Sequence, residues 1–114
     1  MSKREPLFLV ADILEAAKKI QKFTKGMNYD KFVNDEKTVD AVIRNFEIIG
    51  EASNRLPEVF RTQNSEIEWT RIIGFRNRVI HDYIGVDHSI VWNIIQKFVP
   101  ELIKSISLFA KKNK

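Results

Sequence analysis

The chain has 114 residues and no cysteine, which excludes a disulfide scaffold and a thiolate metal site. This length predicts a single domain, residues 1–114, with short basic tails at both ends. The 19 lysine and arginine residues against 15 acidic ones give a formal charge of +4, which permits a polyanionic partner without requiring one. The sequence opens without a signal-peptide pattern and has no apolar run long enough for a membrane span. We therefore expect a cytoplasmic protein without membrane contact.

The first part of the chain has the apolar spacing of an amphipathic helix. Apolar residues recur at i, i+3, i+4 and i+7 and predict a first helix over residues 6–25. Residues 27–34 then form a connector. Its apolar side chains are expected to pack on the core: Tyr29, Phe32 and Val33.

A second helix is predicted from the same apolar spacing. It begins at Asn34 or Asp35, either of which could cap it, and ends at Arg55. Residues 57–66 follow as a polar stretch opened by a proline, which disfavours helix in the residue before it. One short turn is expected there, over residues 58–61.

Two more helices are predicted in the rest of the chain. The third begins within residues 65–67 and ends near Asp82, and the fourth runs from a cap at Asp87 to about Lys111. Pro100 lies inside the fourth helix and is expected to kink or split it. No alternating strand pattern occurs, so the sequence predicts an all-α fold, an up-down bundle of four or five helices.

The most informative stretch lies between Gly74 and Asp87. It gathers six polar or ionisable residues at one end of the third helix: Arg76, Asn77, Arg78, His81, Asp82 and Tyr83. The surface of a bundle does not need a histidine and a tyrosine beside two arginines. A structural explanation stays open, in which His81 interacts with the helix C-terminus and Tyr83 packs with its hydroxyl at the rim of the core.

Arg76 and His81 do not share a face of a straight helix. Each residue turns the helix by about 100°, so side chains five residues apart point about 140° away from each other. Three arrangements would bring the two together: the long arginine reaches round, the helix loosens near His81, or a second chain completes the site. The last arrangement makes a symmetric homodimer natural.

A histidine and an arginine without a metal ion suit the cleavage of RNA. The histidine can move protons near its own pKa, and the arginine can neutralise charge that builds on the phosphoryl oxygens. RNA supplies its own 2′-hydroxyl nucleophile, so no metal-bound water is required. The sequence predicts neither a metal site nor a cofactor, because His81 and His88 have no obvious third ligand.

The motif resembles the R-x4-H-x-Y signature of HEPN-domain proteins of the HepT-like group. Five blocks stand in the order typical of that group, and the resemblance covers roughly residues 7–103, nearly the whole chain. The blocks are DILEAAKKI (12–20), AVIRNFEIIGEASNRL (41–56), IEWTRIIG (67–74), RNRVIHDY (76–83) and VWNIIQKFVPEL (91–102).

The resemblance implies a HEPN-like helical bundle that forms a homodimer, with the two copies of the motif facing a shared cleft. It also implies the toxin component of a toxin–antitoxin system, an endoribonuclease whose catalytic pair is Arg76 and His81. The partner would be a minimal nucleotidyltransferase antitoxin of the MntA type. That enzyme would silence the toxin by adding AMP units to the motif tyrosine, which is Tyr83 in this sequence.

Three further residues within the motif are candidates for supporting roles or for contact with RNA phosphate. Asn77 shares a helix face with His81, four residues away. We expect Arg78 to contact phosphate, although a surface cation is the alternative. Asp82 is expected to pair with Arg78 or to orient His81.

Outside the motif, two carboxylates and two tryptophans have alternative roles. Glu47 and Glu51 lie four residues apart on one face of the second helix. They form either a solvated charge ladder or a support for the guanidinium of Arg76 across the bundle. Trp69 and Trp92 are expected to pack in the bundle rather than to stack on bases, and His88 is expected to be incidental beside the Asp87 cap.

Functions of other classes stay open at this stage. In one, the dimer is a non-catalytic module that binds nucleotide or docks a nucleotidyltransferase, and the arginine–histidine pair is a ligand site or a relic. In another, the chain is a purely structural helical dimer. The intact Arg76, His81 and Tyr83 favour the ribonuclease.

Overall fold

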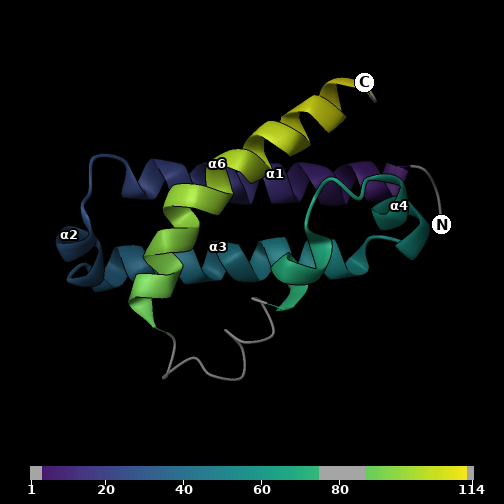
Figure 1. Cartoon of the computed structure of the whole chain (residues 1–114). Coiled ribbons are helices and arrows are strands. Elements are labelled where there is room, and N and C mark those ends of the chain that lie inside the picture. The colour runs from purple at the N-terminus through teal and green to yellow at the C-terminus, as the bar shows by residue number, and fades with distance from the viewer. Residues whose placement is uncertain (1–3, 75–86, 113–114) are drawn as a thin grey trace.

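The computed structural model describes residues 4–74 and 87–112 of the chain (Figure 1). Within these ranges the protein consists of helices and turns without a strand, which confirms the predicted all-α fold. Residues 69–74 are also helical. The helices described over their full length are α1 (Arg4–Thr24), α2 (Tyr29–Val33), α3 (Glu36–Arg55), α4 (Glu58–Gln63) and α6 (His88–Lys112).

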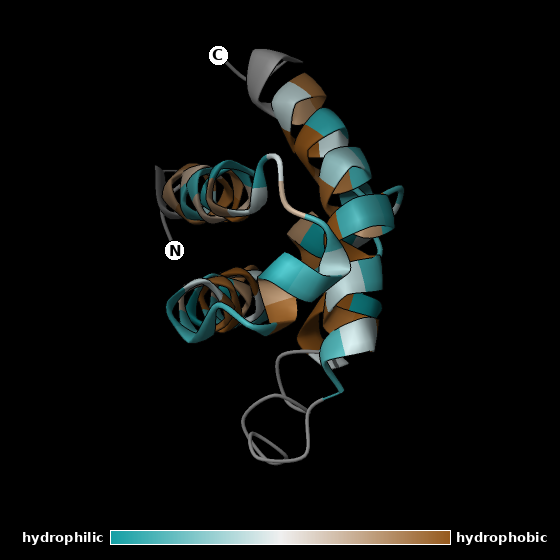
Figure 2. Cartoon of the chain, turned by 90° about the vertical axis from the view of Figure 1, so that its left-hand side faces the viewer, coloured by the Kyte–Doolittle hydropathy of each residue, from teal (hydrophilic) through white to brown (hydrophobic). Residues whose placement is uncertain are grey.

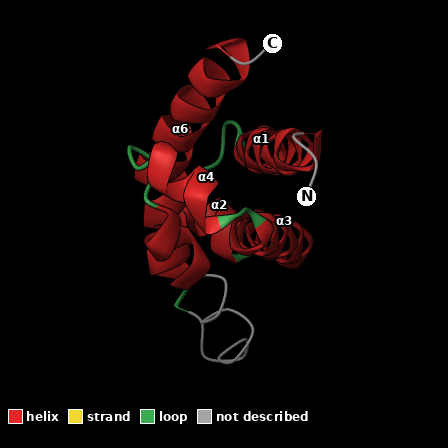
Figure 3. Ribbon diagram, turned by 90° about the vertical axis from the view of Figure 1, so that its right-hand side faces the viewer, coloured by secondary structure: helices red, strands yellow, loops and turns green. Residues whose placement is uncertain are grey.

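Three long helices build the bundle. α1 packs along α3 and against α6, and the short α2 contacts both α3 and α6. Seen along their axes, α1 and α3 lie side by side and α6 runs across them (Figures 2 and 3). Each of these helices contributes large apolar side chains that are fully buried, and so does Leu56 at the C-cap of α3: Ile13, Ile20, Phe32, Val42, Ile49, Leu56, Val91, Val99 and Ile106. No described helix combines the length and the apolar character that a membrane span needs.

α1 matches the helix predicted over residues 6–25. Its last turn is closed by the hydroxyl of Thr24, which donates a hydrogen bond to the carbonyl of Ile20 at 2.8 Å. Gly26 then has a φ of +78°, a left-handed conformation that glycine adopts without the steric cost of a Cβ atom. The chain reverses here and leads into α2.

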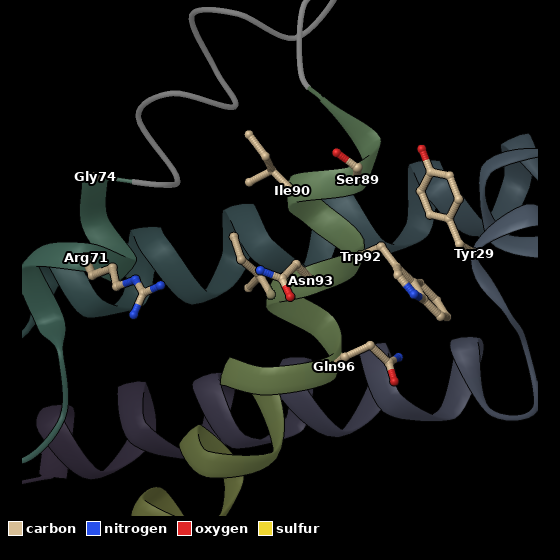
Figure 4. Close-up of a pocket in the computed structure, with 9 residues that line it drawn as sticks. Tyr29, Arg71, Gly74, Ser89, Ile90, Trp92, Asn93 and Gln96 are labelled. Atoms are coloured by element: carbon tan, nitrogen blue, oxygen red, sulfur yellow. The ribbon is translucent and has the colours of Figure 1, made fainter.

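The connector predicted over residues 27–34 contains a short helix, α2. Asn28 caps it, since its side-chain oxygen accepts a hydrogen bond from the N–H of Lys31 at 2.9 Å. The prediction that this segment packs on the core is confirmed for Phe32, which is fully buried. It is wrong for Tyr29, whose side chain is 37% exposed. At the first position of α2, Tyr29 lies beside the first turns of α6 rather than under them (Figure 4).

α3 begins and ends as predicted, with Asp35 as its cap. The carboxylate of Asp35 accepts hydrogen bonds from the N–H of Thr38 at 3.2 Å and from the Thr38 hydroxyl at 2.9 Å. These hydrogen bonds lower the pKa of the Asp35 carboxyl below its ordinary value. At the other end, Leu56 adopts an extended conformation (φ −64°, ψ 139°) before Pro57.

The region after α3 differs from the prediction in two details. The turn expected over residues 58–61 extends into α4, and the next helix begins at residue 69 rather than within residues 65–67. The delay comes from a turn at Asn64, whose carbonyl accepts hydrogen bonds from the N–H of Ile67 at 3.2 Å and from the indole of Trp69 at 3.0 Å. In this turn the carbonyl of Asn64 bonds to groups other than the N–H four residues later, which it would bond in an α-helix.

α6 continues through Pro100 for its full 25 residues. The expectation that the proline splits this helix is therefore wrong, whereas its axis does change direction along its length (Figure 1). Pro100 and Gln96 are both exposed, so water can reach the Gln96 carbonyl that the proline cannot bond. The helix thus keeps its buried face on both sides of Pro100, with Val99 and Leu102 in the core.

Candidate functional site

The motif on which the predicted site rests lies outside the described residues. This holds for six predicted site residues: Arg76, Asn77, Arg78, His81, Asp82 and Tyr83. Their roles stay predictions. The structure describes the frame around them, which ends at Gly74 on one side and begins again at Asp87 on the other.

The N-terminal side of this frame is the helical segment 69–74. Trp69 is buried, and its indole Nε1 donates a hydrogen bond to the carbonyl of Asn64 at 3.0 Å. The guanidinium of Arg71 lies 5.6 Å from the centre of the Phe98 ring on α6, within the range of a cation–π contact. These contacts hold the segment against α4 and α6 close to the point where the motif begins.

The C-terminal side of the frame is the first turn of α6, which Asp87 caps as predicted. The carboxylate oxygen Oδ1 of Asp87 accepts hydrogen bonds from the N–H of Ser89 at 2.8 Å and from the Ser89 hydroxyl at 2.6 Å. The backbone carbonyl of Asp87 accepts hydrogen bonds from Ile90 and Val91. The bonds from Ser89 hold the pKa of the Asp87 carboxyl below its ordinary value, so the cap is charged at neutral pH.

An open hollow of about 870 Å³ lies between the two sides of the frame (Figure 4). Its lining comes from α2, from the segment 69–74 and from the first turns of α6, and includes Tyr29, Arg71, Gly74, Ser89, Trp92 and Gln96. Because Gly74 and Ser89 both line it, the chain leaves the described fold and returns to it beside this hollow. No carboxylate is among the described residues that line it.

None of the residues that line this hollow was predicted to form a site, and Tyr29 and Trp92 were expected only to pack in the bundle. A signal was present, because Ser89, Asn93 and Gln96 recur at i, i+4 and i+7 and so form a polar stripe on a mostly apolar helix. Tyr29 carries no such signal. It lies far from α6 in the sequence, and only the packing of α2 brings it there (Figure 4).

The two carboxylates of α3 were predicted either to form a solvated charge ladder or to support Arg76. Glu47 forms an ion pair with Arg44 one turn earlier, with 3.9 Å between the oxygen and the nitrogen. The Arg44 side chain is 70% exposed, so solvent screens this pair. Glu51 is also exposed on α3. The alternative role, a contact with Arg76, involves a residue outside the described part of the chain and stays a prediction.

Both tryptophans pack in the bundle, as predicted. Trp69 is buried, and its ring lies 6.5 Å from that of Phe60. Trp92 is only half-buried: one part of its ring contacts Phe32, with 5.2 Å between the ring centres, and the residue also lines the hollow. The indole of Trp92 is therefore a structural contact and part of the candidate site at once.

Comparison with known proteins places the chain in a family. A family model described as ribonuclease HepT-like matches residues 13–108, and the chain belongs to this family. No solved structure matches the chain.

Curated relatives agree with this assignment over almost their whole length. The chain is 39% identical over 108 residues to "Putative RNase MJ1380" from Methanocaldococcus jannaschii, covering 95% of this chain and 99% of the relative. It is 40% identical over 111 residues to "Putative RNase MJ0127" from the same organism, covering 97% and 92%. It is 39% identical over 100 residues to "Probable ribonuclease HepT" from Thermococcus cleftensis, covering 88% and 91%.

Proposed function

We propose that this member of the HepT-like ribonuclease family is a metal-independent endoribonuclease and the toxin component of a toxin–antitoxin system. Family membership supports a ribonuclease activity in general. Arg76 and His81, in a motif typical of the family, support the specific chemistry. The observation that carries the proposal is the carboxylate-free lining of the hollow beside both ends of the motif segment, because RNA phosphate needs a surface that does not repel it.

In the proposed reaction the 2′-oxygen of the RNA attacks the neighbouring phosphorus, and the bond from phosphorus to the 5′-oxygen of the next nucleotide breaks. His81 takes the proton of the 2′-hydroxyl and becomes an imidazolium. This imidazolium then gives the proton to the departing 5′-oxygen. A group with a pKa near 6.5 exchanges protons in both directions at neutral pH. Arg76 stabilises the charge on the phosphoryl oxygens through two N–H donors of its guanidinium.

The active unit of the proposal is a homodimer. Arg76 of one protomer and His81 of the other act on the same phosphate, which resolves the difficulty that one straight helix directs the two side chains apart. Glu47 and Glu51 are the α3 carboxylates that would support Arg76, and Asn77, Arg78 and Asp82 would complete the surroundings of the phosphate.

Regulation in the proposal acts through Tyr83. A minimal nucleotidyltransferase antitoxin of the MntA type adds AMP to its hydroxyl, which places a negative charge and a bulky base two residues from His81. The added phosphate forms charge-assisted hydrogen bonds with the motif arginines and repels incoming RNA. The modified toxin therefore loses its substrate without any change in the helical bundle.

An RNA cleavage assay in the presence of EDTA tests the proposal. We expect the wild-type protein to cleave a single-stranded RNA and the His81→Ala variant to be inactive while it keeps the circular dichroism spectrum of the wild type. Cleavage that persists in His81→Ala would exclude the proposed site. A folded wild-type dimer that binds nucleotide but never cleaves RNA would instead favour the non-catalytic module.

A further inference from the structure

A strip of polar and aromatic side chains follows one side of α6 away from the motif segment. Figure 4 shows Ser89, Tyr29, Trp92 and Gln96 in this order from the start of the helix, with Asn93 nearer to Arg71. Ser89 is the third residue after the undescribed segment, and Gln96 lies two turns further along α6. The strip therefore begins close to the point where the described chain resumes.

The strip continues into a second hollow, of about 630 Å³, because Gln96 lines both. This second hollow lies between α6 and the last turns of α1, and three lysines dominate its charged lining: Lys18, Lys22 and Lys25. Lys18 and Lys22 lie one turn apart on the same face of α1, and Lys25 directly follows the last residue of this helix. All three are exposed.

These three lysines are not neutralised within the part of the chain that the structure describes, since no ion pair joins any of them to a carboxylate there. Their neighbour Lys19 differs, because its ammonium lies 3.4 Å from the carboxylate of Glu15. A row of unpaired ammonium groups repels itself, and a bound polyanion relieves that repulsion.

The charge on the other side of α6 has the opposite sign. A hollow next to Arg71 and Phe98 is lined by three carboxylates, Glu66, Glu68 and Glu101. Arg71 is itself held there by Glu68, with 3.1 Å between the guanidinium and the carboxylate. No carboxylate is among the described residues that line the strip or the lysine hollow. A phosphate backbone that leaves the motif is therefore drawn to the side of α1 and repelled from the side of the glutamates.

The aromatic part of the strip points to nucleic acid rather than to an acidic protein. Tyr29 is 37% exposed, and the half-buried Trp92 lies beside it (Figure 4). Exposed aromatic rings beside a row of cations are the usual composition of a surface for single-stranded nucleic acid, in which bases stack and phosphates meet ammonium groups. The amide of Gln96 offers both donors and an acceptor to a base edge.

We infer that single-stranded RNA runs from the cleavage site along this strip, with bases on Tyr29 and Trp92 and phosphates on Lys18, Lys22 and Lys25. The inference rests on the proposed function, since it takes the motif as the place where RNA is cleaved. It adds a binding path on α1, α2 and α6 that is separate from the reacting groups.

Fluorescence anisotropy with a labelled single-stranded RNA measures this path. All binding variants carry His81→Ala so that the RNA stays intact. The test variant changes Lys18, Lys22 and Lys25 to Gln. The matched control also changes three lysines to Gln, and these are exposed and line neither hollow: Lys31, Lys37 and Lys104. We expect the test variant to bind the RNA roughly tenfold more weakly. The slope of log K against the logarithm of the salt concentration should become smaller by about 2, or about 0.7 for each lost phosphate contact. The control should change affinity by less than about twofold.

Changes at Tyr29 separate stacking from charge. Tyr29→Phe should keep the affinity, whereas Tyr29→Leu should lose roughly tenfold, because base stacking needs a ring. Lysine and control variants that bind RNA equally well would overturn the path. A second result would also overturn the path: the lysine variant loses as much affinity for polyaspartate as for RNA, and Tyr29→Leu leaves the affinity for RNA unchanged. That result would indicate a site for an acidic protein.

The failure of this inference can be told apart from failure of the proposed function. If the protein with its native His81 cleaves RNA but the lysine changes affect neither binding nor cleavage, the path is wrong and the function stands. If that protein never cleaves RNA but binding still depends on the three lysines and on Tyr29, the path stands and the proposed chemistry is wrong.

Discussion

The ring of Phe32 on α2 lies 5.2 Å, centre to centre, from the indole ring of Trp92 on α6. Phe32 is fully buried, whereas Trp92 is half-buried and lines the hollow beside the motif segment. The contact connects the hydrophobic core directly to the wall of the candidate site. A change in the packing of Phe32 therefore reaches a side chain that we propose to meet RNA.

Phe32→Ala should lower the free energy of unfolding by about 3–5 kcal/mol, the usual cost of the cavity left by a buried phenylalanine. It should also shift the tryptophan fluorescence, since the indole of Trp92 loses its neighbour. Denaturation in urea measures the first effect. Phe23→Ala is the control, because that side chain is 38% exposed and its loss should cost far less. Equal destabilisation by the two changes would contradict the packing described above.

The caps at Asp35 and Asp87 should make stability depend on pH in the acid range. Both carboxyls have a folded pKa below the unfolded value of about 3.9, so each stabilises the fold above that value and loses its effect as the pH falls through the lowered pKa. Asp87→Ala should therefore lower the melting temperature at pH 7 and matter less and less toward pH 2. Thermal melts across this range provide the measurement, and Asp87→Asn, which keeps an acceptor oxygen, should retain much of the wild-type stability at pH 7. A difference between wild type and Asp87→Ala that is the same at both ends of the range would show that the charge of the cap is irrelevant.

A site shared between protomers predicts complementation between two inactive variants. Arg76→Ala and His81→Ala should each lose about 10²- to 10⁴-fold in cleavage rate, as expected when a proton-transfer group or its electrostatic partner is removed. Mixed and allowed to exchange subunits, they should recover about a quarter of the wild-type activity, because half the dimers are mixed and one of their two sites is intact. Cleavage of a labelled RNA before and after mixing measures this. A mixture as inactive as its components, with mixed dimers confirmed by native mass spectrometry, would assign both residues to one protomer.

The ends of the RNA products report the mechanism. Attack by the 2′-hydroxyl leaves a 2′,3′-cyclic phosphate, or the phosphate formed by its hydrolysis, on one fragment and a 5′-hydroxyl on the other. Mass spectrometry of the fragments distinguishes these ends. Products with a 5′-phosphate that form only when Mg²⁺ is added would refute the role proposed for His81.

Tyr83→Phe should separate cleavage from silencing. The tyrosine hydroxyl titrates near 10 and is a poor proton carrier at pH 7, so the variant should keep most of the cleavage activity. Co-expressed with the nucleotidyltransferase, it should stay active while the wild type gains one or more AMP masses and is silenced. Intact-protein mass spectrometry reads the modification, and AMP masses on Tyr83→Phe would place the acceptor elsewhere.

Local sequence signals were enough for the long helices. α1, α3 and α6 each have apolar residues at helical spacing over five or more turns, and Asp35 and Asp87 cap α3 and α6 as their side chains predict. The five-residue α2 was missed, because a helix of little more than one turn has no measurable period. The late start at residue 69 was missed for another reason: the turn at Asn64 depends on the indole of Trp69, a contact between side chain and backbone that spacing cannot reveal.

The candidate site also has a part that the sequence reveals and a part that only the packing of the helices reveals. Arg76, His81 and Tyr83 are recognisable from a short motif, because the chemistry proposed for them depends on residue type and order. The surface beside them is not, because Tyr29 and Gln96 come together only when α2 and α6 pack (Figure 4). Lys18, Lys22 and Lys25 were visible in the sequence only as positive charge near the end of a helix, and it takes the position of α6 to turn that charge into one side of a hollow.

The cap of α6 bears on how the motif segment, residues 75–86, can be exchanged between relatives. Every hydrogen bond described for Asp87 goes to Ser89, Ile90 or Val91, and Val91 is fully buried, so the register of α6 is fixed by residues that follow the motif segment. An exchange of residues 75–86 for the corresponding stretch of a relative would leave every residue of this cap in the chain. Such chimaeras would transplant the reaction chemistry of one family member onto the binding surface of another, and their substrate preference would show which of the two selects the RNA.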